Sequence, residues 1–321
     1  MKPIRFTAVL IVLLILNGSA HAQGWSQIKL NTGGKDLNTV YFLDSKRGWA
    51  GGDDGFLSHT EDGGRTWVPQ SVGTKSAIND IYFRDEEKGF LLAGNSIFTT
   101  RDGVSWSQSR IFLPEEFEGA DVELYSVRFS SKKKGWVVGS ISKRDRVVDS
   151  ILVYTDDEGL SWRRQRAPSK LELIHIDFVN DKRGWIVGDG GTVLFTRDAG
   201  ASWTKQNVGA TGTLYHVDFR NDKDGWVVGE RGTLLRTTDG GDTWTKVTTN
   251  TNATLLSIQF SNDEEGWAIG RSGTILKSSD EGRSWVQQES TTKQNLYSLI
   301  FNKKVGWIVG GGGVALRYER D

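Results

Sequence analysis

Short runs of apolar and β-branched residues alternate with turns rich in glycine, asparagine and aspartate along most of the chain. The clearest unit spans residues 214–246 and reads LYHVDFRNDKDGWVVGERGTLLRTTDGGDTWTK. Its strand-like runs are residues 214–219, 225–229, 233–237 and 243–246. Short runs rich in valine, threonine and aromatic residues, bounded by turn residues, are typical of β-strands. No helical period of apolar residues follows the N-terminal segment, so the pattern predicts an all-β fold.

The same unit recurs along the chain, marked each time by a glycine followed by an aromatic residue. The interval from Trp185 to Trp226, and again to Trp267, is 41 residues. The marked aromatic residues are Trp49, Phe90, Trp136, Trp185, Trp226, Trp267 and Trp307. A second series of tryptophans falls between them, at Trp25, Trp67, Trp106, Trp162, Trp203, Trp244 and Trp285. A repeat of about 41 residues with four short strands, present seven times, predicts one seven-bladed β-propeller with four strands per blade.

The end of the expected third strand carries the motif Ser/Thr-x-Asp-x-Gly-x-Ser/Thr-Trp, which resembles the Asp box of sialidase-type propellers. Its aspartates are Asp62, Asp102, Asp157, Asp198, Asp239 and Asp280, and the copy at Asp102 is one residue shorter. At this spacing the carboxylate accepts hydrogen bonds from backbone N–H groups of the turn, and the glycine adopts a positive φ. The tryptophan then packs between blades. We therefore expect the six aspartates to be structural.

Residues 1–22 have the features of a secretory signal peptide, which leaves residues 23–321 as the propeller. Two basic residues precede an apolar run at residues 7–16, and the sequence AHA marks a cleavage site before Gln23. The apolar run has about half the length of a membrane-spanning helix. The sequence therefore predicts an exported protein, soluble after cleavage, in the periplasm or, in a photosynthetic host, in the thylakoid lumen.

The two ends of the propeller segment complement each other. Trp25 occupies the outer-strand position of the repeat without the three inner strands before it, and the last repeat stops after its third strand. We expect residues 24–28 to form the fourth strand of the last blade. This pairing closes the ring and covers an exposed sheet edge.

Composition narrows the function. Lys plus Arg and Asp plus Glu each total 40, so the chain lacks the net positive charge that favours nucleic-acid binding. It has no cysteine, which excludes disulfides, thiolate metal sites and cysteine nucleophiles. Phosphate-binding loops and dinucleotide motifs are also absent, and we expect no cofactor. The Arg-Ile-Pro signature of sialidases does not occur. We therefore expect no enzymatic activity.

Two copies of the sequence His-x-Asp-Phe occupy the same position on neighbouring inner strands, at His175 with Asp177 and at His216 with Asp218. Two imidazoles and two carboxylates near the central channel suit a divalent metal. The histidine position carries serine, threonine or aspartate in the other repeats, which favours a structural role. The sequence leaves both readings open, and we assign no metal site.

Residues 226–244, WVVGERGTLLRTTDGGDTW, carry a family resemblance. Together with the YxVxF and GWxVG patterns and the seven repeats, they resemble the photosystem II assembly and stability factor propellers of cyanobacteria and chloroplasts. The resemblance covers the whole propeller segment. It implies a non-catalytic role in the lumen, holding a newly made reaction-centre subunit during early assembly. It also implies an arginine patch, with Arg231, Arg236, Arg271 and Arg317 as candidates. Cyanobacterial members commonly carry a lipidated cysteine after the signal peptide, which this chain lacks.

Two insertions in the third repeat, at residues 110–121 and 140–150, interrupt the period. Both belong to connections that open on the same face of a four-stranded blade, so we expect them to meet there. Exposed apolar residues in loops require burial against each other or against a partner. Candidate partner-binding residues are Phe112, Phe117, Lys143, Arg144 and Arg146. Two loops that pack only against each other are the alternative.

These observations predict a monomeric, non-enzymatic, exported propeller that binds a protein partner, such as a membrane-protein subunit during assembly. One alternative is an exported propeller of a non-photosynthetic bacterium that binds an envelope protein or a glycan. A third and weaker alternative is an exported glycoside hydrolase.

Overall fold

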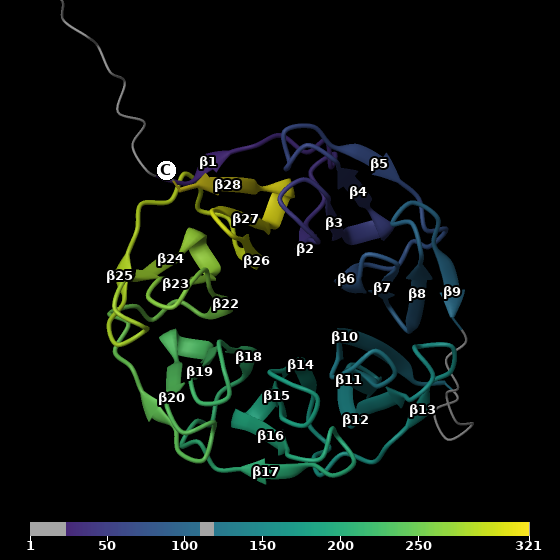
Figure 1. Ribbon diagram of the computed structural model, residues 1–321, viewed down its shortest axis with the longest axis vertical. Helices are drawn as coiled ribbons and strands as arrows, with labels where there is room; N and C mark the ends of the chain where they lie inside the picture. The colour runs from purple at the N-terminus through teal and green to yellow at the C-terminus, as the bar shows by residue number, and fades with distance from the viewer. Residues whose placement is uncertain (1–23, 110–118, 321) are drawn as a thin grey trace, which may run out of the picture.

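The computed structural model describes residues 24–109 and 119–320, which form seven antiparallel sheets of four strands arranged as a ring (Figure 1). In each sheet the first strand lines the centre of the ring and the fourth lies at the rim. The predicted seven-bladed, all-β propeller is therefore confirmed. The predicted signal peptide, residues 1–22, lies outside the described residues.

The strands follow the repeat that the sequence predicts. In blades 1 to 4 they are β2 (Leu37–Phe42), β3 (Gly48–Gly52), β4 (Leu57–Thr60), β5 (Val68–Gln70), β6 (Ile78–Asp85), β7 (Lys88–Ala93), β8 (Ser96–Thr100), β9 (Ser107–Ser109), β10 (Asp121–Phe129), β11 (Gly135–Lys143), β12 (Arg146–Thr155), β13 (Arg163–Arg164), β14 (Leu173–Phe178), β15 (Gly184–Gly188), β16 (Thr192–Thr196) and β17 (Thr204–Gln206). In blades 5 to 7 they are β18 (Leu214–Phe219), β19 (Gly225–Gly229), β20 (Leu234–Thr237), β21 (Thr245–Lys246), β22 (Leu255–Phe260), β23 (Gly266–Gly270), β24 (Ile275–Ser278), β25 (Val286–Gln287), β26 (Leu296–Asn302), β27 (Val305–Gly310), β28 (Ala315–Glu319) and β1 (Ser26–Gln27).

The first described strand and the last share one sheet. In blade 7, β1 pairs with β28, with Ser26 opposite Arg317 and Gln27 opposite Leu316. Trp25 is buried there, with its ring centroid 5.4 Å from that of Trp267 in blade 6. The N-terminal strand thus covers the outer edge of the last blade and adds an aromatic ring to its interface with blade 6.

Each interface between blades is built from three stacked or edge-on aromatic rings. Between blades 4 and 5, Trp185 stacks on Phe219 with ring centroids 3.5 Å apart, and Trp244 meets the same phenylalanine edge-on. A Cβ atom on Gly225 would lie 2.4 Å from Cε1 of Phe219, so only glycine leaves room for the ring. The same contact recurs in all seven blades and explains the glycine before each marked aromatic residue.

The chain direction gives the ring two distinct faces. The turns between first and second strands and the Asp boxes between third and fourth strands open on one face, which we call the Asp-box face. The blade-to-blade connections and the turns between second and third strands open on the other, the connection face. Five of these second-to-third turns form short 3-10 helices, η1 (Asp53–Gly55), η3 (Asp189–Gly191), η4 (Glu230–Gly232), η5 (Arg271–Gly273) and η6 (Gly311–Gly313).

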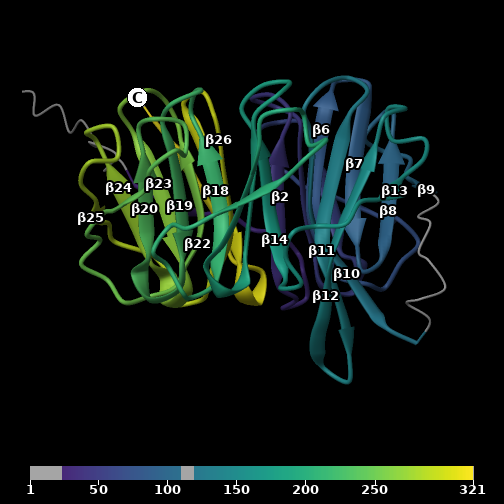
Figure 2. The same ribbon diagram turned by 90° about the horizontal axis from the view of Figure 1, so that it is seen from below.

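Blade 3 departs from this plan. Its β11–β12 hairpin extends beyond the connection face (Figure 2). The expected loop insertion at residues 140–150 is wrong in form, because these residues lengthen two paired strands and leave only Arg144 and Asp145 in the turn. The added length also pairs with β10, where Asp121 lies opposite Ser142.

Candidate functional site

The Asp-box carboxylates are fully engaged in their own turns. Asp239 Oδ1 accepts hydrogen bonds from the Thr243 backbone N–H at 2.9 Å and the Thr237 hydroxyl at 2.7 Å, and Oδ2 accepts the Thr243 hydroxyl at 2.6 Å. The Thr243 hydroxyl and N–H and the Thr237 hydroxyl lower the pKa of Asp239 to about 2. The predicted turn geometry recurs at the other five aspartates, Asp62, Asp102, Asp157, Asp198 and Asp280. Each carboxylate holds a turn together, as expected.

Each box also anchors a neighbouring blade. The glycine of the fifth blade's box, Gly241, has a φ of 83° and lies against Trp185 of blade 4, where an added Cβ would be 2.6 Å from the indole Nε1. Between blades 1 and 2, the indole N–H of Trp49 donates to the carbonyl oxygen of Gly103 at 2.8 Å. The boxes therefore serve the inter-blade contacts that the sequence predicts for them.

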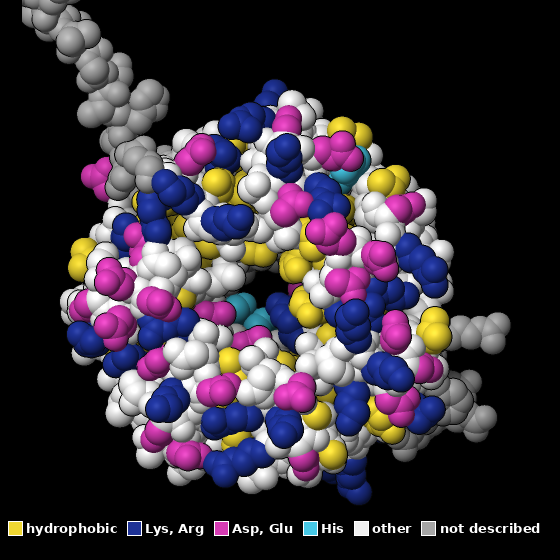
Figure 3. All heavy atoms as spheres, viewed as in Figure 1, with side chains coloured by type: hydrophobic (Ala, Val, Ile, Leu, Met, Phe, Trp, Pro, Cys, Tyr) yellow, Lys and Arg dark blue, Asp and Glu magenta, His cyan; other side chains and the backbone are white. Residues whose placement is uncertain are grey.

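A polar cluster fills the centre of the ring, where Figure 3 shows histidine side chains inside the central opening. The rings of His175 and His216 stack with centroids 3.8 Å apart. Arg128 Nη2 lies 3.2 Å from His175 Nε2, and its Nη1 makes an ion pair with Asp80 at 2.7 Å. Burial and the charge of Arg128 lower the pKa of His216 to about 3.

This geometry disfavours a metal at the histidine pair. Asp177 and Asp218 accept the backbone N–H groups of Phe219 and Phe260 from the next blades, at 3.1 and 3.3 Å. Both ring nitrogens of His175 are engaged, Nε2 by Arg128 at 3.2 Å and Nδ1 by the Val217 backbone N–H at 3.4 Å, so this imidazole has no free nitrogen for a metal. Among residues 24–109 and 119–320, no group of three potential ligands is arranged to hold one. The two His-x-Asp-Phe segments instead link neighbouring inner strands through hydrogen bonds, which supports a structural role for them.

The four arginines expected to form a patch lie on different faces. Arg231 and Arg271 are exposed in the η4 and η5 turns of the connection face. Arg236, on β20, lies beside Asp224, and Arg317, on β28, donates from Nε to the carbonyl oxygen of Gly63 in an Asp box. The structure therefore divides the four between the two faces, with Arg231 and Arg271 on neighbouring blades and Arg236 and Arg317 on blades 5 and 7, and they form no single patch.

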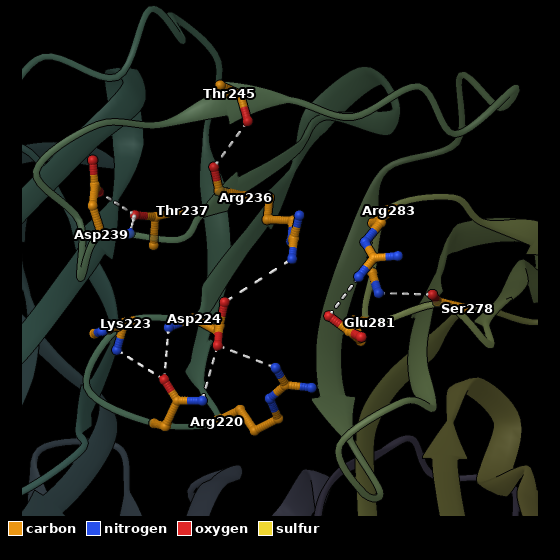
Figure 4. Close-up of polar contacts among 12 residues, drawn as sticks. Arg220, Lys223, Asp224, Arg236, Thr237, Asp239, Thr245, Ser278, Glu281 and Arg283 are labelled. Carbon is orange, nitrogen blue, oxygen red and sulfur yellow. Dashed lines mark hydrogen bonds and ion pairs between the residues drawn. The ribbon is translucent and has the colours of Figure 1, made fainter.

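Arg236 belongs to a larger group of cations on the Asp-box face, which we call the stacked arginines: Arg183, Arg220 and Arg236. Each guanidinium lies over the indole of a second-strand tryptophan, Arg183 over Trp185 at 5.7 Å and Arg220 over Trp226 at 5.6 Å. Figure 4 shows Asp224 between Arg220 and Arg236, at 3.1 and 4.0 Å from their Nη2 atoms.

The stacked arginines carry more charge than their surroundings neutralise. Arg183 donates to the carbonyl oxygens of Asp222 and Gly240, and no carboxylate of the described residues pairs with it. Arg220 Nη1 and Nε and Arg236 Nε are buried without a hydrogen-bond partner in the described part of the chain. Arg220 and Arg236 thus share one carboxylate while Arg183 has none, and incompletely neutralised guanidinium groups of this kind favour an anionic ligand.

Sequence reasoning found Arg236 but missed Arg183 and Arg220. The available signal was their position in the repeat, because Arg183 directly precedes the Gly184-Trp185 pair and Arg220 directly follows the inner-strand Phe219. A cation at either place lies beside a second-strand tryptophan.

The insertion residues are only partly placed. Lys143, Arg144 and Arg146 are exposed at the end of the β11–β12 hairpin, and the following Val147 and Val148 are 41% and 44% exposed. Phe112 and Phe117 lie outside the described residues. The expected meeting of the two insertions therefore stays a prediction.

Comparison with known proteins identifies similar chains. The family model described as photosynthesis system II assembly factor YCF48 matches residues 68–172, 160–253 and 248–319. A segment of 107 residues, 33% of this chain, is 26% identical to the photosystem II assembly lipoprotein Ycf48 of Synechococcus sp. (strain CC9902). The match spans 28% of that relative's length.

Solved structures share the fold. The structure of YCF48 bound to D1 peptide has a TM-score of 0.74 and 22% identity, covering 92% of this chain and 95% of that one. Virginiamycin B lyase from Staphylococcus aureus has a TM-score of 0.78 at 12% identity, covering 93% and 99%. Both structures have the same fold as this chain, and one of them, the lyase, is an enzyme. In the described part of the chain, no helix has the length and apolar character needed to cross a membrane.

Proposed function

Because this chain belongs to the photosynthesis system II assembly factor YCF48 family, we propose that it is a non-enzymatic, exported propeller that binds a membrane subunit of photosystem II during assembly. A similar protein, YCF48, has been solved with a D1 peptide. The proposal assigns this chain a segment of the same subunit as its partner.

The stacked arginines carry the proposal. Arg220 and Arg236 share Asp224, and their remaining buried N–H groups have no partner among the described residues. The side chains of Arg220 and Arg236 remain 15% and 17% exposed, and an acidic side chain or a terminal carboxylate of a partner segment can pair with this exposed part through charge-assisted hydrogen bonds. The flat aromatic surfaces behind the guanidinium groups hold them in place before the partner arrives, which lowers the entropy lost on binding.

The carboxylates of the described residues support a binding role over a catalytic one. The Asp-box carboxylates are engaged by turn donors, and Asp177 and Asp218 brace the inner strands. The single pair of close histidines is buried and has lowered pKa values because of burial, so it holds little charge near neutral pH. No pair of groups here combines an accessible base with a nucleophile, among the residues that the structure describes.

Binding is tested by titrating the full chain with the D1 peptide in a calorimeter. We expect the double variant Arg220→Ala/Arg236→Ala to lose most of the affinity, because it removes the unpaired donors. The matched control is Arg231→Ala/Arg271→Ala, which removes the same charge from the connection face. Thermal unfolding of each variant shows whether the ring is intact.

Two results contradict the proposal in different ways. Failure of the wild-type chain to bind the peptide rejects the D1 segment as the partner. Equal loss of affinity in both double variants, or loss only in the connection-face variant, rejects the stacked arginines as the site. Arg236→Lys, which keeps the charge but not the planar fork, separates charge from geometry.

Export is the remaining part of the proposal. It rests on the n-region, apolar run and AHA cleavage sequence of residues 1–22. N-terminal sequencing of the protein recovered from the periplasmic or lumenal fraction should begin at Gln23. A protein that retains Met1 and fractionates with the cytoplasm contradicts it.

A further inference from the structure

The channel opens on the connection face into a cavity that neither the Asp boxes nor the stacked arginines use. Its volume is about 240 Å³, and three tyrosines line it, Tyr125, Tyr215 and Tyr297. Each stands near the start of an inner strand, in blades 3, 5 and 7, where the blade-to-blade connections enter. The stacked histidines His175 and His216 contribute to the same lining. The cavity therefore combines aromatic side walls with a polar base.

Carboxylates without ion-pair partners surround this mouth. Tyr125 donates its hydroxyl to Glu172 at 2.8 Å, and Tyr297 donates to Asp36 at 3.0 Å. Asn79 donates to Glu123, and Asn38 donates to Asp53 at 3.2 Å. All these donors are neutral. Within residues 24–109 and 119–320, the carboxylates that make no ion pair here are Asp36, Asp53, Glu123, Glu172, Asp189 and Glu230.

The carboxylates also repel one another. Burial raises the pKa of Glu123, and the nearby charge of Glu172 raises it further, against the hydrogen bond from Asn79. The hydroxyl of Tyr125 is held near both carboxylates, and its pKa is raised by burial and by their charge. Unpaired negative charge of this kind, at the rim of a cavity, favours entry of a cation.

His216 lines the cavity, and its imidazole keeps hydrogen-bonding capacity that the described residues do not use. His216 Nδ1 is buried and has no hydrogen-bond partner among the described residues. The ring is neutral near pH 7, because burial and Arg128 lower its pKa to about 3. One nitrogen of a neutral imidazole is an acceptor. Arg128, the cation nearest to it, is already neutralised by its ion pair with Asp80 at 2.7 Å.

We propose that the mouth of the channel on the connection face binds the ammonium or guanidinium end of a lysine or arginine side chain presented by a polypeptide segment. The tyrosine faces provide cation–π contacts, and the ring of carboxylates provides the attraction. An anion is disfavoured by the same carboxylates. A cavity of about 240 Å³ accepts one long side chain and excludes a folded element.

The test measures binding of short peptides to the full chain by calorimetry or saturation-transfer NMR. The probe is acetyl-Gly-Arg-Gly-amide, and its matched control carries citrulline, which has the shape of arginine without the charge. We expect the arginine peptide to bind at least about tenfold more tightly, and added salt to weaken it. Equal binding of the two peptides overturns the proposal.

Protein variants locate the site. Glu123→Gln/Glu172→Gln should weaken arginine-peptide binding by about tenfold, because it removes two attracting charges while keeping size and hydrogen bonding. Asp242→Asn is the control, since it removes one exposed carboxylate from the Asp-box face. Equal weakening by the control, or no weakening by the double variant, overturns the assignment. Tyr297→Leu gives a second variant that leaves every charge in place and should also weaken binding.

A third set of measurements distinguishes a polypeptide side chain from a small free amine as the ligand. Tetramethylammonium and putrescine carry the charge without a peptide backbone. If either binds more tightly than the arginine peptide, the ligand is a small free amine and the polypeptide assignment is overturned. No photosystem subunit is used in these measurements, so their outcome is independent of the proposed partner at the stacked arginines.

Discussion

The stacked arginines on the Asp-box face and the channel mouth on the connection face hold opposite unpaired charge. At the first, Arg220 and Arg236 share the carboxylate of Asp224, and Arg183 pairs with no carboxylate of the described residues. At the second, six carboxylates form no ion pair among the described residues, and five of them accept hydrogen bonds from neutral groups. The chain has 40 basic and 40 acidic residues in total, and the opposite charges of these two regions are local, since the exposed Arg231 and Arg271 also lie on the connection face.

The two regions also differ in what supports the charge. The guanidinium groups lie flat on tryptophans that are part of the blade interfaces, so removing one of those rings disturbs both the fold and the site. The carboxylates at the mouth are held by hydroxyl and amide groups on the edge of the channel. We therefore expect substitutions on the Asp-box face to cost stability, and substitutions at the mouth to change binding with little effect on folding.

The largest expected effect comes from removing an aromatic ring under the stacked arginines. Trp226 is fully buried, stacks on Phe260 at 3.8 Å and supports both Arg220 and Arg236. Trp226→Ala should lower the free energy of unfolding by about 3–5 kcal/mol, measured by urea unfolding. Tyr215→Ala at the mouth, where the ring is half-buried, should cost about 1 kcal/mol. Similar losses in the two variants would break the contrast between the faces.

A smaller effect is expected from the shared carboxylate. Asp224→Ala leaves Arg220 and Arg236 without their common partner in a half-buried groove, and should lower the free energy of unfolding by about 1–3 kcal/mol. Binding of the D1 peptide should be retained or strengthened, because more donors are left unpaired. Glu172→Ala at the mouth is the comparison, and we expect less than about 1 kcal/mol there. If Glu172→Ala lowered the free energy of unfolding more than Asp224→Ala, the charges on the Asp-box face would not be the ones that stabilise the fold.

The fold was predictable because its determinants are periodic. A repeat of short strands, glycine before tryptophan and six Asp boxes follow from local rules, and the structure explains each through one contact, such as Phe219 against Gly225. The form of the second insertion was not predictable in this way. Residues such as Val147 and Val148 continue a strand, but Arg144 and Asp145 adopt positive φ in the two-residue turn, a conformation more typical of asparagine and glycine.

The sites were less predictable, since they depend on charges brought together from several blades. Arg231 and Arg236 lie five residues apart in one motif, yet they face opposite sides of the ring. The mouth carboxylates fall at two repeat positions, directly before the first leucine of the inner-strand motif, as Asp36 does, and directly after the second strand, as Asp53 does. A repeat-by-repeat comparison of charges would therefore group them, but not the stacked arginines, which fall at three different positions and become neighbours only when the blades fold and pack.

Lowering the pH should affect the stability contributed by carboxylates on the two faces in opposite directions. The pKa of Asp239 falls from 3.8 to about 2 because of its hydrogen bonds, so its contribution to stability is present above about pH 4 and is lost as the pH falls towards 2. Burial and the charge of Glu172 raise the pKa of Glu123. Protonation of Glu123 at acidic pH therefore relieves its repulsion with Glu172. Urea unfolding from pH 6 to 2 should therefore show a shallower acid loss in Asp239→Asn, by less than about 1 kcal/mol after solvent screening. An unchanged slope would show that this carboxylate does not stabilise the turn.

The smallest predicted effect is a gain. Glu123→Gln keeps an oxygen acceptor for Asn79 and removes the charge that faces Glu172. Because the two carboxylates repel each other in a partly buried site, the variant should raise the free energy of unfolding by about 0.5 kcal/mol at pH 7, and this gain should shrink as the pH is lowered and the wild-type carboxyl takes up a proton. The same substitution should weaken arginine-peptide binding. Stability and affinity would then change in opposite directions, which is expected where charge is kept for a ligand rather than for the fold; a loss of stability at pH 7 would assign Glu123 to the fold instead.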